Sequence, residues 1–123
     1  MSRAERDPPR ATVTLSRAQW MEIVNGWDLY QSVVPYDSQD TRWAGIMPAL
    51  CRAILDKLRK TTDRFVDVDG RWTSWGIVAI WAASVTCLKS CPGVSSAMAS
   101  LVPQITAQEP TRGVETENDR EAA

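Results

Sequence analysis

The longest stretch of the chain without charge lies in its second half. Residues 72–88 contain no charged side chain, and Lys89 is the single charge between Trp72 and Gln108. A helix that faces water on one side keeps a polar face, and this segment has almost none. The pattern predicts a helix over about residues 73–90 that is either surrounded by other helices at the centre of a bundle or inserted in a membrane.

A first amphipathic helix is predicted upstream, where apolar residues recur at helical spacing between Trp20 and Val34. Ser16 and Gln19 have the spacing of a capping box, in which each side chain bonds the other residue's backbone N–H. Pro35 ends the pattern. The sequence therefore predicts a helix that begins after Ser16.

A second amphipathic helix is predicted from about Met47 towards Phe65, with Pro48 in its first turn, where a missing N–H is tolerated. Residues 67–70 (DVDG) have the composition of a turn that ends it. A weaker apolar helix is predicted over residues 94–105, where Pro103 cuts it short. Residues 12–15 and 66–68 alternate too briefly to predict strands. The expected fold class is all-α, a small helical bundle around a central apolar helix at about residues 73–90.

Both ends of the chain are polar, and one modest domain accounts for the remainder. Residues 1–11 are charged and contain a proline pair, whereas residues 106–123 are acidic and nearly free of apolar side chains. Such composition is typical of disordered tails. The expected helical domain spans residues 12–105.

Composition narrows the function classes. The net charge of −1 gives no general attraction to nucleic acid. Histidine is absent, and no phosphate-binding glycine loop or catalytic motif occurs, so we expect no enzyme, no cofactor and no metal site. The three cysteines are expected to be reduced thiols, which favours the cytoplasm. The apolar segment leaves open an association with intracellular membranes.

Two segments, both between Leu58 and Cys87, resemble parts of the Bcl family of apoptosis regulators. Residues 58–65 (LRKTTDRF) resemble the family's third homology box, in which a leucine and a later apolar residue enter a groove while an aspartate pairs with an arginine. The resemblance gives these roles to Leu58, Phe65 and Asp63. Asp69-Gly70, followed by Trp75-Gly76 and Ile-Val-Ala, resembles the first homology box and the start of the buried central helix. The family's groove arginine is replaced by Ile77, and Arg71 is the candidate substitute.

The resemblance implies a shortened, divergent, viral-type relative that captures an amphipathic helix of a partner protein, with host–virus interaction and apoptosis regulation as its setting. The groove would be built from the second helix and the start of the third, with Trp75 and Gly76 at its floor. The implied partner-binding residues are Leu58, Asp63, Phe65, Arg71, Trp75 and Gly76. The pro- or anti-apoptotic sense stays open.

Two alternatives remain at this point. The chain could be a small helical adaptor or homo-oligomer that hides its six tryptophans at a subunit interface, where tryptophan is enriched. It could also associate with membranes through a hairpin formed by residues 72–88 and 94–108, although the first of these lies at the short end of a bilayer span.

Overall fold

The computed structural model describes residues 8–110, apart from the side chain of Thr86. These residues form two strands, five α-helices and one short 3₁₀ helix. In chain order the elements are β1 (Arg10–Ser16), α1 (Arg17–Val33), η2 (Tyr36–Ser38), α2 (Thr41–Lys60), β2 (Phe65–Arg71), α3 (Trp72–Ser84), α4 (Thr86–Lys89) and α5 (Pro92–Ala107).

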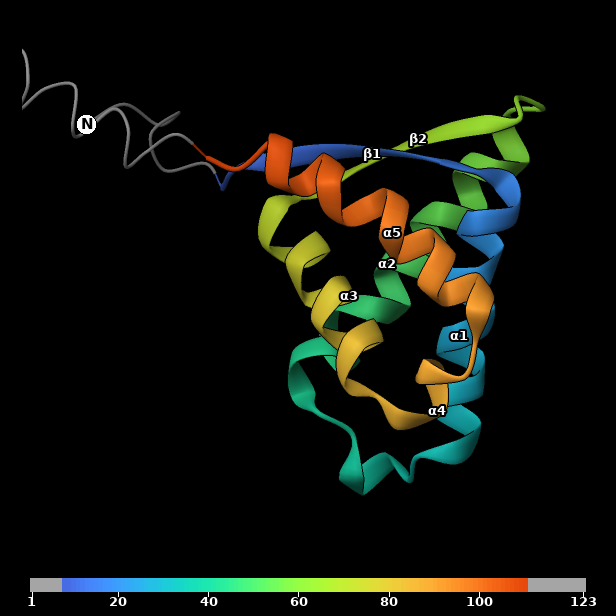
Figure 1. Ribbon diagram of the computed structural model, residues 1–123, viewed down its shortest axis with the longest axis vertical. Helices are drawn as coiled ribbons and strands as arrows, with labels where there is room; N and C mark the ends of the chain where they lie inside the picture. The colour runs from blue at the N-terminus through green and yellow to red at the C-terminus, as the bar shows by residue number, and fades with distance from the viewer. Residues whose placement is uncertain (1–7, 111–123) are drawn as a thin grey trace, which may run out of the picture.

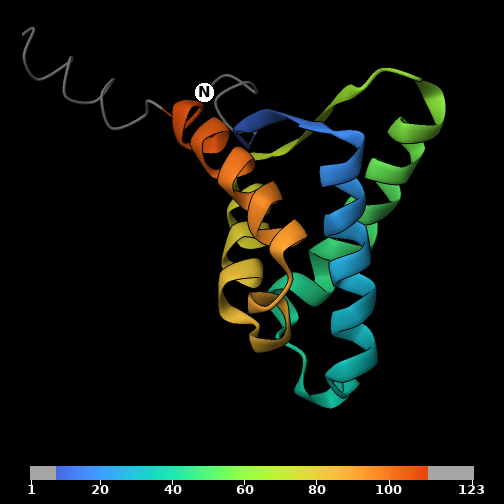
Figure 2. The same cartoon turned by 45° about the vertical axis from the view of Figure 1, so that its right-hand side comes forward.

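The two strands form an antiparallel ribbon that lies across one end of a group of helices (Figure 1). The hairpin of α1 and α2 connects the strands, and α3 to α5 follow them. Turning the molecule shows all the long helices extending to the same side of the ribbon (Figure 2). The helix-dominated architecture confirms the predicted bundle in its coarse form, but the fold is not purely all-α because it includes the ribbon.

The strands escaped prediction because each has only a short alternating signal. Ala11, Val13 and Leu15 of β1 are buried, and they lie opposite Gly70, Val68 and Val66 of β2. Each strand is stabilised by a partner strand whose paired residues lie 49 to 61 positions away along the chain, which no local pattern reveals. Residues 67–70, predicted to be a turn, therefore lie inside β2.

Gly70 has a steric reason to be glycine. A Cβ at this position would lie 3.2 Å from the indole nitrogen of Trp75, which is tighter than most real contacts. Trp75 itself donates its indole N–H to the carbonyl of Ala11 (3.0 Å). The missing side chain thus lets the ribbon lie directly on this indole.

Helix boundaries confirm some local signals and correct others. The capping box of Ser16 and Gln19 is present with both of its hydrogen bonds, as predicted for α1. The second helix begins at Thr41 and not near Met47, because the Asp40 carboxylate caps it. Pro48 consequently lies inside α2, where the ring is accommodated within the helix.

Two predictions about the C-terminal helices also change. Pro103 lies inside α5, which continues to Ala107. The helix predicted over residues 73–90 ends at Ser84, where the backbone becomes extended at Val85 before the short α4.

The apolar helix α3 is buried on one side only. Trp75, Val78, Trp81 and Ala82 lie in the core, whereas Ile80 is 45 % exposed. The central helix of the prediction is therefore a wall of the bundle. No helix within residues 8–110 combines the length and the apolarity needed to cross a membrane.

The folded part extends beyond the predicted bounds of 12–105. β1 starts at Arg10, and Ala11 is buried. At the other end, the Gln108 side chain bonds the backbone of Thr12. The predicted tails fall largely in residues 1–7 and 111–123, which lie outside the described residues.

Tryptophan dominates the core. Five of the six indoles are buried within the chain itself: Trp20, Trp27, Trp43, Trp75 and Trp81. Trp27, Trp43 and Trp81 gather around Tyr30, and Trp27 and Trp81 form an edge-on pair with centroids 6.0 Å apart. Trp20 and Trp75 form a separate aromatic pair. These five side chains are not available for the subunit interface that the homo-oligomer alternative assigned to them.

Cys51 supplies a pH-dependent prediction. Burial, reinforced by the nearby charge of Asp28, raises the pKa of this thiol from its ordinary value near 9 to about 12. The folded state then keeps a proton that the unfolded state releases, so stability is full below about pH 9 and falls as the pH rises towards 12. Thermal unfolding between pH 8 and 10.5 should show a steeper decline of Tm for the native chain than for Cys51→Ala, and parallel declines would contradict the prediction.

Candidate binding groove

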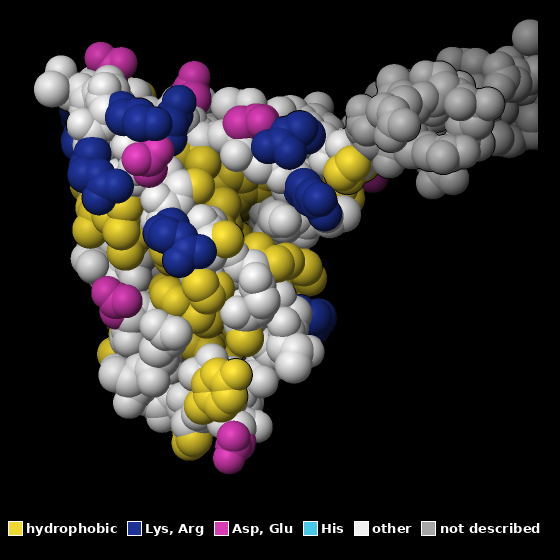
Figure 3. All heavy atoms as spheres, turned by 180° about the vertical axis from the view of Figure 1, so that it is seen from behind, with side chains coloured by type: hydrophobic (Ala, Val, Ile, Leu, Met, Phe, Trp, Pro, Cys, Tyr) yellow, Lys and Arg dark blue, Asp and Glu magenta, His cyan; other side chains and the backbone are white. Residues whose placement is uncertain are grey.

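An open groove of about 330 Å³ lies between α2, the end of β2 and the start of α3. Its lining residues are Arg10, Gly45, Ile46, Ala49, Leu50, Ala53, Gly70, Arg71 and Ser74. Seen from behind, the molecule shows a hollow of apolar side chains, with both basic and acidic side chains around it (Figure 3). The charged side chains that line the groove itself are those of Arg10 and Arg71. The groove therefore combines an apolar surface with a basic margin.

The α2 wall of the groove is built from small residues. Gly45, Ala49 and Ala53 recur every four positions, so they share one face of the helix. A Cβ at Gly45 would meet nothing within 4 Å, which shows that the surface there is open. Ile46 and Leu50 supply larger apolar contacts beside them. A backbone can approach α2 closely along this face.

Two arginines mark the opposite side of the groove. Arg10 forms an ion pair with Asp69 (2.7 Å), and the hydrogen bond from its guanidinium holds the pKa of Asp69 below its usual range. Arg71, the last residue of β2, has no ion-pair partner among residues 8–110. Its charge is available to a carboxylate that enters the groove.

The lining comes from α2, the end of β2 and the start of α3, and two of these, the second helix and the start of the third, are the elements that the resemblance named for a groove. Of the predicted site residues, Arg71 lies on it. Trp75 does not, because its side chain is fully buried beneath the ribbon. Gly76 is not among the lining residues either, and a Cβ there would meet nothing within 4 Å.

The other predicted residues lie elsewhere. Because α2 ends at Lys60, Leu58 and Phe65 do not share a helical face. Leu58 is buried near the end of α2, Asp63 lies in the connecting loop, and Phe65 opens β2 with 57 % of its surface exposed. Residues 58–65 thus run through a helix end, a loop and a strand, which contradicts the helical geometry that the homology-box resemblance assumed.

Sequence reasoning missed the small residues of the α2 wall. Their spacing was a usable signal, but it became visible only once residues 41–46 belonged to the same helix as residues 47–60. Placing the helix start near Met47 separated Gly45 from Ala49 and Ala53.

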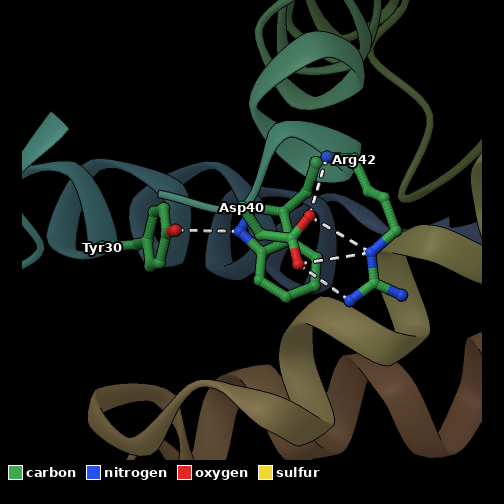
Figure 4. Close-up of polar contacts among 4 residues, drawn as sticks. Tyr30, Asp40 and Arg42 are labelled. Carbon is green, nitrogen blue, oxygen red and sulfur yellow. Dashed lines mark hydrogen bonds and ion pairs between the residues drawn. The ribbon is translucent and has the colours of Figure 1, made fainter. Parts of the chain in front are cut away.

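A second hollow, of about 310 Å³, lies at the far end of the bundle from the ribbon. Around it, the Tyr30 hydroxyl accepts a hydrogen bond from the indole N–H of Trp43 (2.8 Å), and the Asp40 carboxylate bonds both the backbone and the guanidinium of Arg42 (Figure 4). The side-chain bond from Arg42 lowers the pKa of Asp40. These contacts fix the start of α2, so the polar groups already have structural partners.

A third hollow, of about 430 Å³, lies between α1 and α2 beside Leu58. Arg17, which lines this hollow, donates hydrogen bonds to the carbonyls of Leu58 (2.7 Å) and Thr61 (2.8 Å). Both carbonyls lie at the C-terminal end of α2. Arg17 is therefore engaged in closing that helix. The groove at Arg71 differs, because within residues 8–110 the Arg71 side chain forms neither an ion pair nor a hydrogen bond, whereas Arg17 is held by backbone carbonyls.

No metal centre is formed by the described residues, since no three His, Cys, Asp or Glu side chains in residues 8–110 lie close enough to hold an ion. No protein-family model matches the sequence, and neither a curated protein nor a solved structure is significantly similar to it. The resemblance to the Bcl family consequently stays a prediction.

Proposed function

We propose that this chain is an interaction protein whose groove captures an amphipathic helix of a partner protein. The observation that carries the proposal is the open apolar groove between α2 and the start of α3, with Arg71 at its margin. Helix-in-groove binding uses apolar side chains at positions i, i+3 or i+4, and i+7 of the bound helix. The small residues of α2 favour this mode because they let the partner backbone come close.

The partner helix is expected to carry an acidic side chain beside its apolar stripe. Such a carboxylate would face Arg71, which has no ion-pair partner among residues 8–110. A charge pair at the margin of an interface chiefly sets orientation and association rate, while burial of apolar side chains supplies most of the affinity. We therefore assign Arg71 the choice of partner and the α2 wall the strength of binding.

The Bcl resemblance supports a first choice of partners. It implies the amphipathic helices of pro-apoptotic proteins, encountered in the cytoplasm or at intracellular membranes. A helical adaptor with an unrelated partner would use the same groove, so the two readings differ in which helices bind.

The test is fluorescence anisotropy with labelled amphipathic helix peptides, including those of pro-apoptotic proteins and an equal number of unrelated acidic helices. We expect saturable binding that Arg71→Glu weakens by about tenfold or more, because a repulsive charge replaces an attractive one. Gly76→Glu lies outside the groove and serves as the matched control, with unchanged affinity.

Ala49→Glu adds a second, independent perturbation, because Ala49 lies exposed on the groove wall. This variant should lower the affinity for every helix that binds the parent chain, and its circular dichroism spectrum should show an intact fold. Absence of binding across the whole panel by a folded protein would refute the helix-capture proposal. Binding of unrelated helices alone would remove the apoptotic reading and keep the groove.

A further inference from the structure

The two outer edges of the ribbon differ in whether their backbone groups have hydrogen-bond partners. Along the outer edge of β1, the Gln104 side chain receives the N–H of Thr14 (2.7 Å) and donates to its carbonyl (2.7 Å). Gln108, one turn further along α5, does the same for Thr12, at 2.9 and 2.7 Å. Two glutamine amides thus take the place of a neighbouring strand and close this edge.

The outer edge of β2 has no such cover. Because Thr12 and Thr14 point their backbone groups away from β2, the residues opposite them, Asp69 and Asp67, point theirs away from β1. Within residues 8–110, no hydrogen bond from another element reaches the outward backbone N–H and carbonyl groups of Asp67 or Asp69. One side of the ribbon therefore presents an open strand edge.

We propose that the open edge of β2 binds an extended segment of a protein partner by strand addition, and that this segment carries Lys or Arg at alternate positions. In strand addition the main-chain hydrogen bonds supply affinity, and alternate side chains supply specificity. On the exposed face of the ribbon the added strand would lie beside Asp67 and Asp69. Opposite charges on adjacent strands stabilise pairing, whereas like charges oppose it.

Asp67 is the stronger of the two anchors. Its carboxylate accepts a hydrogen bond from the Thr14 hydroxyl (2.6 Å) and pairs with no cation among residues 8–110. Asp69 is partly neutralised by Arg10. A basic residue of the partner would therefore find an oriented, uncompensated carboxylate at Asp67.

The same two carboxylates disfavour a second copy of this chain at the edge. Antiparallel pairing of β2 with its own copy, centred on Val68, would set each Asp67 against the other copy's Asp69. Four carboxylates would then crowd one face of a four-stranded sheet. The two carboxylates therefore favour binding of a basic strand and disfavour pairing of the edge with a second copy of the chain. Such repulsion of an unwanted partner increases specificity.

The probe is a labelled peptide of residues 65–71 that carries Asp67→Lys and Asp69→Lys, compared with the unchanged peptide 65–71. We expect saturable anisotropy binding of the lysine peptide to the full chain, and at least tenfold weaker binding of the unchanged one. Methylating alternate backbone nitrogens of the lysine peptide removes the main-chain hydrogen bonds and should abolish binding. Equal binding of the methylated peptide would overturn strand addition.

Asp67→Pro tests the edge from the protein side. It removes one outward N–H, at a position where proline is tolerated because that group faces solvent. We expect at least tenfold weaker binding than for Asp67→Ala, which loses the charge but keeps the N–H. Equal affinity of the two folded variants would overturn the proposal. Should Asp67→Pro fail to fold, the methylated peptide decides the matter.

This inference does not depend on the helix-capture proposal, although the two surfaces meet at Gly70 and Arg71. Arg71→Glu should weaken the binding of acidic helices to the groove. The same variant should bind the lysine peptide at least as tightly as the parent chain does. The two proposals can therefore fail separately.

Discussion

Replacing Val78 with aspartate should unfold the domain at room temperature. Val78 is fully buried on the inner face of α3, and no charged side chain is buried in the described part of the chain to compensate a carboxylate. An ion placed in an apolar interior costs several kcal/mol, which is comparable to the total stability of a small domain, about 5–15 kcal/mol. Circular dichroism and thermal melts of the purified variant give the answer directly.

Ile80→Asp is the matched control, because it lies two positions away in the same uncharged helix and is 45 % exposed. We expect a folded protein with a Tm within a few degrees of the parent, since the carboxylate can remain in water. Equal tolerance of the two substitutions would contradict the one-sided burial of α3. Loss of folding at both positions would point to a partner or membrane covering the outer face.

Replacing Trp75 with alanine should have the second largest effect. The side chain is fully buried beneath the ribbon and contacts Trp20, with ring centroids 5.7 Å apart. Truncating a buried tryptophan to alanine typically costs about 3–5 kcal/mol, through lost burial and the cavity left behind. Urea unfolding should show a correspondingly lower midpoint, and a loss below about 1 kcal/mol would refute this role.

A pair of conservative variants separates packing from hydrogen bonding at these indoles. The Trp75 N–H donates to the carbonyl of Ala11, whereas the buried Trp81 N–H has no hydrogen-bond partner among the described residues. Trp75→Phe and Trp81→Phe each replace an indole with a smaller ring, but only Trp75→Phe removes a hydrogen bond. We expect Trp75→Phe to be more destabilising by about 1 kcal/mol. Equal losses would show that the bond to Ala11 contributes nothing.

The two proposed surfaces lie on the same end of the molecule and follow from one arrangement. The ribbon lies across the helices, so its open edge and the start of α3 border the groove of α2. α5 covers the opposite edge with its glutamines. The fold therefore leaves one side of the ribbon closed and the other available for partners.

Local signals determined the start of α1. Both hydrogen bonds of the Ser16 capping box lie within three residues, so the start of this helix can be predicted from neighbouring residues alone. The expectation of a groove between the second helix and the start of the third came from the resemblance to the Bcl family and not from a local pattern. Arg71, named there as the candidate substitute for the family's arginine, lines the groove of this structure.

Tertiary structure decided the remainder. Residues 67–70 read as a turn by composition, yet they become a strand because Ala11 and Val13 lie opposite them. The segment 58–65 read as a continuous helix, but the pairing of Phe65 with Ser16 begins the strand there. Strand pairing and edge exposure depend on residues distant in sequence, and the free energy that selects them comes from burial shared between elements. For that reason the sequence by itself determined the helices and their apolar faces, while only the assembled fold determined the ribbon, its open edge and the residues that line the groove.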